Sequence, residues 1–195
     1  IWIMPIAING SGTITGLSGA GAGIAEAEVV APTALSHLSG KNGGIIQVVS
    51  TVKTDTASHS VGVGAVSGDV LTASITPSSS SNKVLIIMSL YVSSPDEGVY
   101  GTFYKGGSVL TAAIGDANSA RQRVSANSFI YNDNRATELN KMFLDSPATT
   151  SATTYSVRIG GSKNGTTDYY INRSYQFPDD NRRATGISTL TLMEV

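Results

Sequence analysis

The chain has 195 residues and a formal net charge of −1, with 13 Lys and Arg against 14 Asp and Glu. Charged residues make up 14% of it, compared with about 25% in an average soluble domain, while 46 residues are Ser or Thr and 21 are Gly. The low charge excludes the basic surface that binds nucleic acid or anionic membranes. The absence of Cys excludes a disulfide scaffold, a thiolate zinc site and a cysteine nucleophile.

The apolar content is high enough for a folded core, at 41% of the chain. The longest apolar run, Val84–Met88, is far too short to span a bilayer. We therefore expect a folded, Ser/Thr/Gly-rich β-protein of the kind common outside cells, with no nucleic-acid partner and no membrane insertion.

The first 44 residues are dominated by Gly and other small residues, which cannot bury enough side-chain area to fold alone. Residues 24–38 have the spacing of a short helix, but Pro32 interrupts any longer one. We interpret residues 1–44 as an extended arm, either a flexible linker or a segment that becomes ordered by packing on other copies of itself. In the second case, the side chains buried around a shared axis would be Ile14, Leu17, Ile24, Val29 and Leu35.

From residue 45 onward, short β-branched and alternating segments follow one another, separated by polar turns. The hairpin signal is clearest at Lys105–Gly107, where two glycines accept a positive φ without strain. We predict an all-β domain over residues 45–195, an antiparallel, jelly-roll-like β-sandwich. The predicted strands, in chain order, are 45–52, 71–76, 83–92, 100–104, 108–114, 124–131, 138–144, 154–159, 168–173 and 186–194.

Catalytic patterns are sparse. The two histidines, His37 and His59, have no nucleophile and carboxylate arranged around them in the sequence, and most carboxylates stand in turns, where they cap or solvate the loop. Residues 132–134 and 179–181 each gather oxygen ligands that calcium favours, but Asx-rich turns explain them without a metal. We predict no enzymatic activity, no cofactor and no metal ion.

The aromatic residues gather late in the chain. Adjacent residues of a strand point to opposite faces, so at most one of Tyr169 and Tyr170 can enter the core. Arg173 and Tyr175 follow closely, and Tyr and Arg are the residue types enriched at binding hot spots. We predict a ligand-binding or subunit-contacting surface formed by Tyr169, Tyr170, Arg173 and Tyr175, with ordinary surface tyrosines and solvated arginines as the plainer interpretation.

Several segments resemble bacteriophage fibre proteins, especially those of marine and cyanobacterial phages. They are the Asn-Gly-Ser-Gly-Thr-Ile-Thr-Gly string within 9–18, together with 29–36, 42–49, 76–86 and 190–195. The resemblance implies a homotrimer in the virion, with an N-terminal stem attached to other tail or capsid proteins and a distal β-sandwich that contacts the host surface. It assigns no functional residues, because such families share scaffold motifs while their binding loops vary.

Two classes of function therefore compete. The first is a non-enzymatic structural protein of a virion, either a tail fibre that binds a host glycan or a capsid fibre or decoration protein. The second is an extracellular carbohydrate-binding module or hydrolase. A hydrolase would need a cluster of carboxylates in one groove.

Overall fold

The computed structural model divides the chain into two units, Ile1–Gly44 and Ile45–Val195. It describes residues 44–95, 98–130, 135–161, 165–176, 178, 181 and 183–195, together with the backbone of residues 7–8 and 14–15. In the first unit, β1 (Ala7–Ile8) pairs antiparallel with β2 (Ile14–Thr15).

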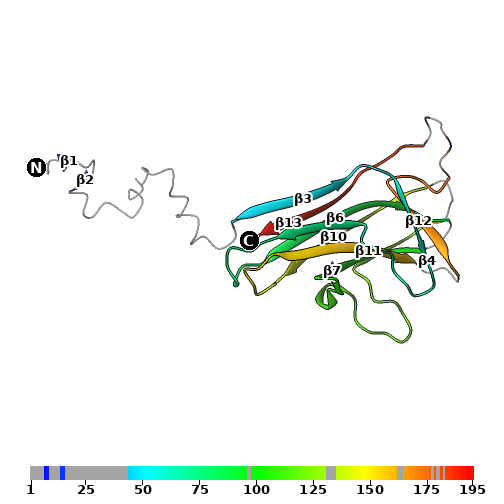
Figure 1. Cartoon of the computed structure of the whole chain (residues 1–195), viewed down its shortest axis with the longest axis horizontal. Helices are drawn as coiled ribbons and strands as arrows, with labels where there is room; N and C mark the ends of the chain where they lie inside the picture. Colours follow the sequence, from blue (N-terminus) through cyan, green and yellow to red (C-terminus); the bar gives the residue numbers. More distant parts are fainter. Residues whose placement is uncertain are drawn as a thin grey trace, which may run out of the picture. The chain divides into compact units, whose positions relative to one another are not determined.

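The second unit is built from two antiparallel sheets packed face to face (Figure 1), which confirms the predicted β-sandwich. A six-stranded sheet contains β3 (Gln47–Lys53), β4 (Ala57–Val61), β6 (Val84–Ser93), β10 (Thr137–Asp145), β12 (Thr167–Ile171) and β13 (Ser188–Glu194). A five-stranded sheet contains β5 (Leu71–Ile75), β7 (Gly98–Lys105), β8 (Ser108–Val109), β9 (Ala126–Phe129) and β11 (Thr153–Gly161). No helix among the described residues is long and apolar enough to cross a membrane.

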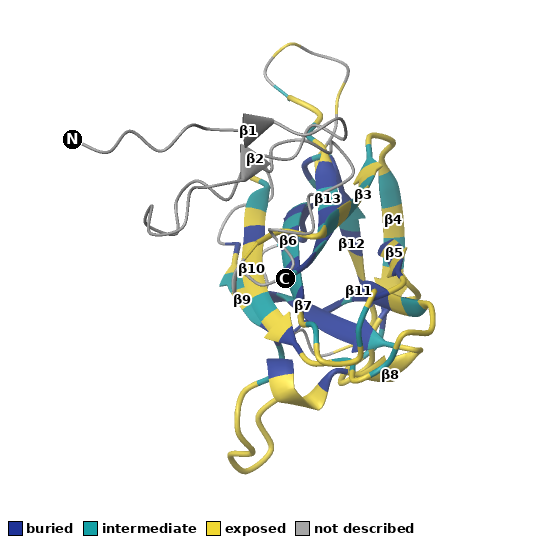
Figure 2. Cartoon of the chain, turned by 90° about the vertical axis from the view of Figure 1, so that its left-hand side faces the viewer, coloured by how far each residue is buried: buried dark blue, intermediate teal, exposed yellow. Residues whose placement is uncertain are grey.

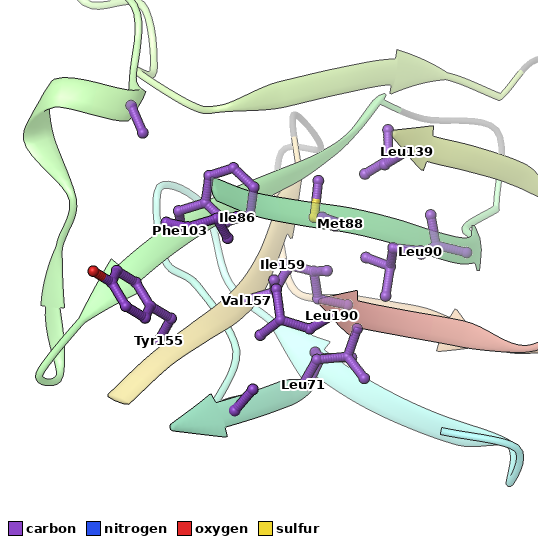
Figure 3. Close-up of a cluster of buried hydrophobic side chains, with 14 of the residues drawn as sticks. Leu71, Ile86, Met88, Leu90, Phe103, Leu139, Tyr155, Val157, Ile159 and Leu190 are labelled. Carbon is purple, nitrogen blue, oxygen red and sulfur yellow. The ribbon is translucent and has the colours of Figure 1, made fainter. Parts of the chain in front are cut away.

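The hydrophobic core lies between the two sheets and is filled by the inward-facing side chains of their strands. Along β6, every second residue is fully buried, and the residues between are half-exposed. Figure 3 shows side chains of both sheets meeting in this layer, with Leu71 and Val157 of the five-stranded sheet near Leu190 of the six-stranded one. Outside the core, residues along β10 and in the loops are exposed to solvent, as Figure 2 shows.

The central strand β6 changes partner along one of its edges. β10 pairs with it from Val84 to Val92, whereas the other edge pairs with β13 up to Ser89 and with β12 at Val92 and Ser93. The sheet therefore forks at Tyr91, with β13 and β3 on one branch and β12 and β4 on the other.

Asn172 closes this fork. Its backbone N–H donates to the Tyr91 carbonyl, and its Nδ2 donates to the carbonyls of Lys53 (2.8 Å) and Asp55 (2.9 Å). The Ser188 hydroxyl accepts from the Tyr91 amide (3.0 Å) and donates to Asn172 Oδ1 (2.7 Å). Asn172 has a φ of 62°, a left-handed conformation that Asn tolerates better than most residues. Asn172 and Ser188 thus supply hydrogen-bond partners to buried backbone groups at the fork, where the hydrogen bonds between strands are interrupted.

A second buried polar cluster surrounds Glu194 at the end of β13. Its Oε1 accepts from the Ser78 amide (2.7 Å), the Ser78 hydroxyl (2.6 Å) and Asn82 Nδ2 (2.6 Å), while its Oε2 accepts from Gln47 Nε2. Burial alone raises the pKa of this carboxyl, but these hydrogen bonds stabilise the ionised form more strongly and lower the pKa to about 2.

The sandwich has two distinct ends. At the end we call proximal, residue 44 leads into β3, and Gln47, Val84 and Glu194 lie side by side in register. At the opposite, distal end, β4 and β12 extend beyond β6, because Tyr170 pairs with Ser93 while Thr167 pairs with Val61. Figure 1 shows β3 starting at one end of the sandwich and β12 and β4 at the other.

Two local predictions were wrong. Residues 108–114 do not form one strand: β8 ends at Val109, and a 3-10 turn (Thr111–Ala113) follows. The strand β4 was not predicted, since residues 57–61 are mostly small and polar. The predicted hairpin is confirmed, with Gly106 and Gly107 at φ values of 56° and 81°.

Candidate functional site

The alternation of β12 separates the two adjacent tyrosines. Tyr169 points into the core and is 1% exposed, so it does not belong to the predicted surface. Its ring crosses to the five-stranded sheet, where a Cβ placed on Gly161 would lie 1.6 Å from the Tyr169 hydroxyl oxygen. Tyr170, on the opposite face of β12, is half-exposed.

The other three predicted residues form one surface at the distal end. The guanidinium carbon of Arg173 lies 4.1 Å from the centre of the Tyr170 ring, within the range of a cation–π interaction. The Tyr170 and Tyr175 ring centroids are 5.6 Å apart, and their planes are tilted by 49°. All three side chains are partly exposed. We call Tyr170, Arg173 and Tyr175 the distal aromatic surface.

The backbone that carries this surface is held firmly in place. Asn172, between Tyr170 and Arg173, is fully buried and makes the fork contacts described above. The Ser93 hydroxyl donates to the Arg173 carbonyl (2.9 Å), and the Ser174 hydroxyl donates to the Gln176 carbonyl (2.5 Å). The aromatic side chains therefore stand on a preorganised turn, which reduces the entropy lost when a ligand binds.

Asp168 gives the distal aromatic surface a carboxylate close to Tyr170. It shares the outer face of β12 with Tyr170 and is exposed. Burial, and next the negative charge of Asp168, raise the pKa of the Tyr170 hydroxyl, while the positive charge of Arg173 opposes them. The phenol therefore stays protonated at neutral pH. Two stacking rings with guanidinium, phenol and carboxylate groups are suited to bind a polar ring such as a sugar.

A second arginine–tyrosine stack shows what distinguishes the distal one. Arg158 lies 4.1 Å from the centre of the Tyr104 ring on the outer face of the five-stranded sheet. However, Tyr104 is only 7% exposed, and Arg158 Nε donates to Asp69 Oδ1 at 2.7 Å, a bond that lowers the pKa of Asp69. This pair is a structural contact with little ring surface left for a ligand.

A hollow of about 730 Å³ also opens at the outer face of the five-stranded sheet. Tyr100, Asn127 and Phe129 line it from β7 and β9, and Arg121 and Gln122 line it from the loop before β9. No pattern in the sequence predicted this hollow. Alternation predicts that Asn127 and Phe129 share a face, but only the pairing of β9 with β7 brings them beside Tyr100.

The described residues offer little for the catalytic alternative. His59 lies in β4 opposite Tyr169, and burial, followed by the charge of Lys53, lowers the pKa of its ring. Asp145 accepts from Lys105 Nζ (2.8 Å) and from the Tyr155 hydroxyl (2.6 Å). No group of three or more His, Asp or Glu that could hold a metal gathers within the described ranges. Most of the two Asx-rich loops, 132–134 and 179–181, lies outside them.

The predicted contacts of the arm are not described. Leu17, Ile24, Val29 and Leu35 lie outside the described residues, and of Ile14 only the backbone is described, in β2. The arm's association with other copies therefore stays a prediction.

No protein-family model matches the chain, and no curated protein matches it. The class that the structure establishes is the antiparallel β-sandwich, and any function must be argued from its surfaces.

Proposed function

We propose that this chain is a non-enzymatic structural protein of a bacteriophage particle, a trimeric fibre whose N-terminal arm attaches to other virion proteins and whose β-sandwich binds a glycan on the host surface. One observation carries the proposal: the distal aromatic surface lies at the end of the sandwich opposite to the point where the arm joins it. In this proposal, attachment and host recognition lie at opposite ends of the β-sandwich.

The chemistry of the distal aromatic surface suits a neutral or weakly charged sugar. The C–H faces of a sugar ring stack on Tyr170 and Tyr175, while Arg173 and Asp168 supply a donor and an acceptor for its hydroxyl groups. A strongly charged ligand is disfavoured, because the guanidinium and the carboxylate largely offset one another.

The test is binding of the purified full chain to arrayed bacterial lipopolysaccharides and capsular polysaccharides. We expect Arg173→Ala to weaken binding at least about tenfold, the loss typical of a hot-spot arginine. Arg158→Ala is the matched control, since it removes the same kind of arginine–tyrosine stack from the other sheet. The control is expected to keep its binding.

Equal binding by the wild type and by Arg173→Ala, with both correctly folded, would remove the distal aromatic surface from the proposal. Immunogold labelling of intact particles tests the rest of it. Label on the tail supports a tail fibre, label on the head supports the capsid fibre or decoration protein, and unlabelled particles contradict a virion protein.

The hollow beside Tyr100 and Phe129 favours a second candidate, an extracellular carbohydrate-binding module that acts outside any particle. Aromatic and amide side chains around a concave surface of this size are typical of small-ligand sites. Loss of glycan binding in Asn127→Ala but not in Arg173→Ala would favour this candidate.

A further inference from the structure

The outer face of the six-stranded sheet carries three uncharged rows of largely apolar side chains toward its proximal end, and we propose that it packs against a second copy of this chain. This inference rests on the trimeric assembly of the proposed function and names the surface that would form it.

The strand register builds the face row by row. Across β3, β13, β6 and β10, the first row is Val48, Met193, Leu85 and Leu144, all of them apolar. The second row is Ser50, Thr191, Ile87 and Met142, and the third is Val52, Thr189, Ser89 and Asn140. These three rows contain no charged side chain, and all their residues are described. The nearest charges on this face are Glu138, opposite Tyr91 in the next row, and the exposed Lys83, two residues before Leu85 on the proximal side.

The apolar side chains of this face are exposed on β3 and β10 and partly exposed on β6 and β13. Val48 is 53% exposed, Leu144 45% and Met142 65%. Figure 2 shows exposed positions along β10. We call Val48, Leu85, Ile87, Met142, Leu144 and Met193 the apolar face.

The other sheet gives the contrast. Its outer face carries Thr72 and Ser74 on β5 and Thr154 and Arg158 on β11, with Arg158 paired to Asp69. Along β5 and β11 this face keeps the hydrophobic-in, polar-out pattern of antiparallel sheets. Its aromatic residues Tyr100 and Phe129, on β7 and β9, line the hollow described above.

A second copy is the occupant that fits. An uncharged face meets itself without like-charge repulsion, and it offers no complement to a charged partner. Enrichment in Met and depletion of Lys and Glu are features of the buried centre of protein–protein interfaces. The Ser, Thr and Asn side chains of the second and third rows can both donate and accept hydrogen bonds, so they can satisfy one another across the contact.

The size of the face is that of a small interface. Strands about 4.8 Å apart and rows about 7 Å apart give an area of about 400 Å², half of the roughly 800 Å² that each partner buries in a stable interface. Ile45 and Ile46, 60% and 55% exposed, extend the apolar surface toward residue 44.

The test is the mass of the full chain at micromolar concentration, measured by native mass spectrometry and by light scattering. We expect the wild type to be oligomeric and Met142→Lys to raise the dissociation constant at least about a hundredfold, because the interface would bury an unpaired ammonium group. Val48→Lys, on the opposite edge of the face, is expected to do the same. Thr72→Lys, an exposed position on the outer face of the other sheet, is the matched control and should keep the wild-type mass.

Two results would overturn the inference. A monomeric wild type leaves the face without a second copy, and an oligomer that persists in both folded lysine variants assembles through another surface. Thermal unfolding followed by circular dichroism checks that the variants fold. Glycan binding by Arg173→Ala is measured in a separate experiment. Failure of the proposed interface and failure of the proposed glycan-binding surface can therefore be distinguished.

Discussion

At the level of single residues, the tightest constraint is the contact between Gly161 and Tyr169. A Cβ on Gly161 would lie 1.6 Å from the Tyr169 hydroxyl oxygen, 2.2 Å from its Cζ and 2.7 Å from the Gly98 carbonyl oxygen. Because Gly161 of β11 has no side chain, the ring of Tyr169 from the other sheet can reach across the core.

We predict that Gly161→Ala lowers the free energy of unfolding by about 3 kcal/mol, the upper end of the usual cost of overpacking. Tyr169→Phe in the same chain should restore only part of this loss, because the ring carbon Cζ would still be too close. Urea unfolding measures both effects. Gly115→Ala is the control, since nothing lies within 4 Å of its added Cβ. A stability of Gly161→Ala equal to that of the control would contradict the contact.

The sequence predicts the distal aromatic surface in part. Alternation requires that Tyr169 and Tyr170 face opposite ways, and Asp168 could have indicated which one faces solvent, because it shares the face of Tyr170. The stack of Arg173 on Tyr170 could not be predicted, since it depends on the left-handed turn at Asn172, which is fixed by contacts with residues over a hundred positions away.

At the level of elements, the fork of the six-stranded sheet explains both a correct prediction and a missed strand. The run from Val84 to Val92 is apolar except at Ser89 and Tyr91, because β6 is central and pairs along both edges. By contrast, β4 is an edge strand with Ser58 and Ser60 exposed, so it lacks the hydrophobic signal of a strand. Which strands pair is a long-range property, and local periodicity does not encode it.

The fork also makes a prediction about Asn172. Asn172→Ala should lower the free energy of unfolding by about 4 kcal/mol, because it leaves buried carbonyls without donors and places a Cβ-bearing side chain without hydrogen bonds at a positive φ. Asn172→Gly removes the strain of a side chain at a positive φ. We therefore expect its free energy of unfolding to be about 1 kcal/mol higher than that of Asn172→Ala. Chemical denaturation measures both, with the exposed Asn140→Ala as control. A loss under 1 kcal/mol for Asn172→Ala would show that water replaces these bonds.

At the level of the whole molecule, Glu194 joins elements that lie far apart in the chain. Its carboxylate is bonded to Gln47 near the start of the domain and to Ser78 and Asn82, on the connection between β5 of one sheet and β6 of the other. The composition predicted a Ser/Thr-rich sandwich but could not place a buried carboxylate at the proximal end, because two segments far from Glu194 in the chain supply its donors.

We therefore predict a specific acid sensitivity. The pKa of Glu194 falls from its ordinary 4.5 to about 2 in the folded chain, so its ionised form favours folding. This contribution, about 3 kcal/mol at about 1.4 kcal/mol per pH unit, is complete above pH 4.5 and disappears as the pH falls from 4.5 to 2.

Urea unfolding across that range checks the prediction. Glu194→Gln should be less stable at pH 7 and should show a flatter acid limb than the wild type. Glu138→Gln, which changes an exposed glutamate, is expected to retain the wild-type pH profile. An unchanged acid limb in Glu194→Gln would assign the acid sensitivity to other carboxyls.

The opposition of the two ends has a mechanical consequence. Tension between residue 44 and the distal end runs along β3, while the hydrogen bonds from β3 to β13 lie across the strands from Gln47 to Lys53. The ladder is thus loaded in shear, so its bonds must break together rather than one at a time. A particle held by this domain while fluid drags on it would load the sandwich in its most resistant direction.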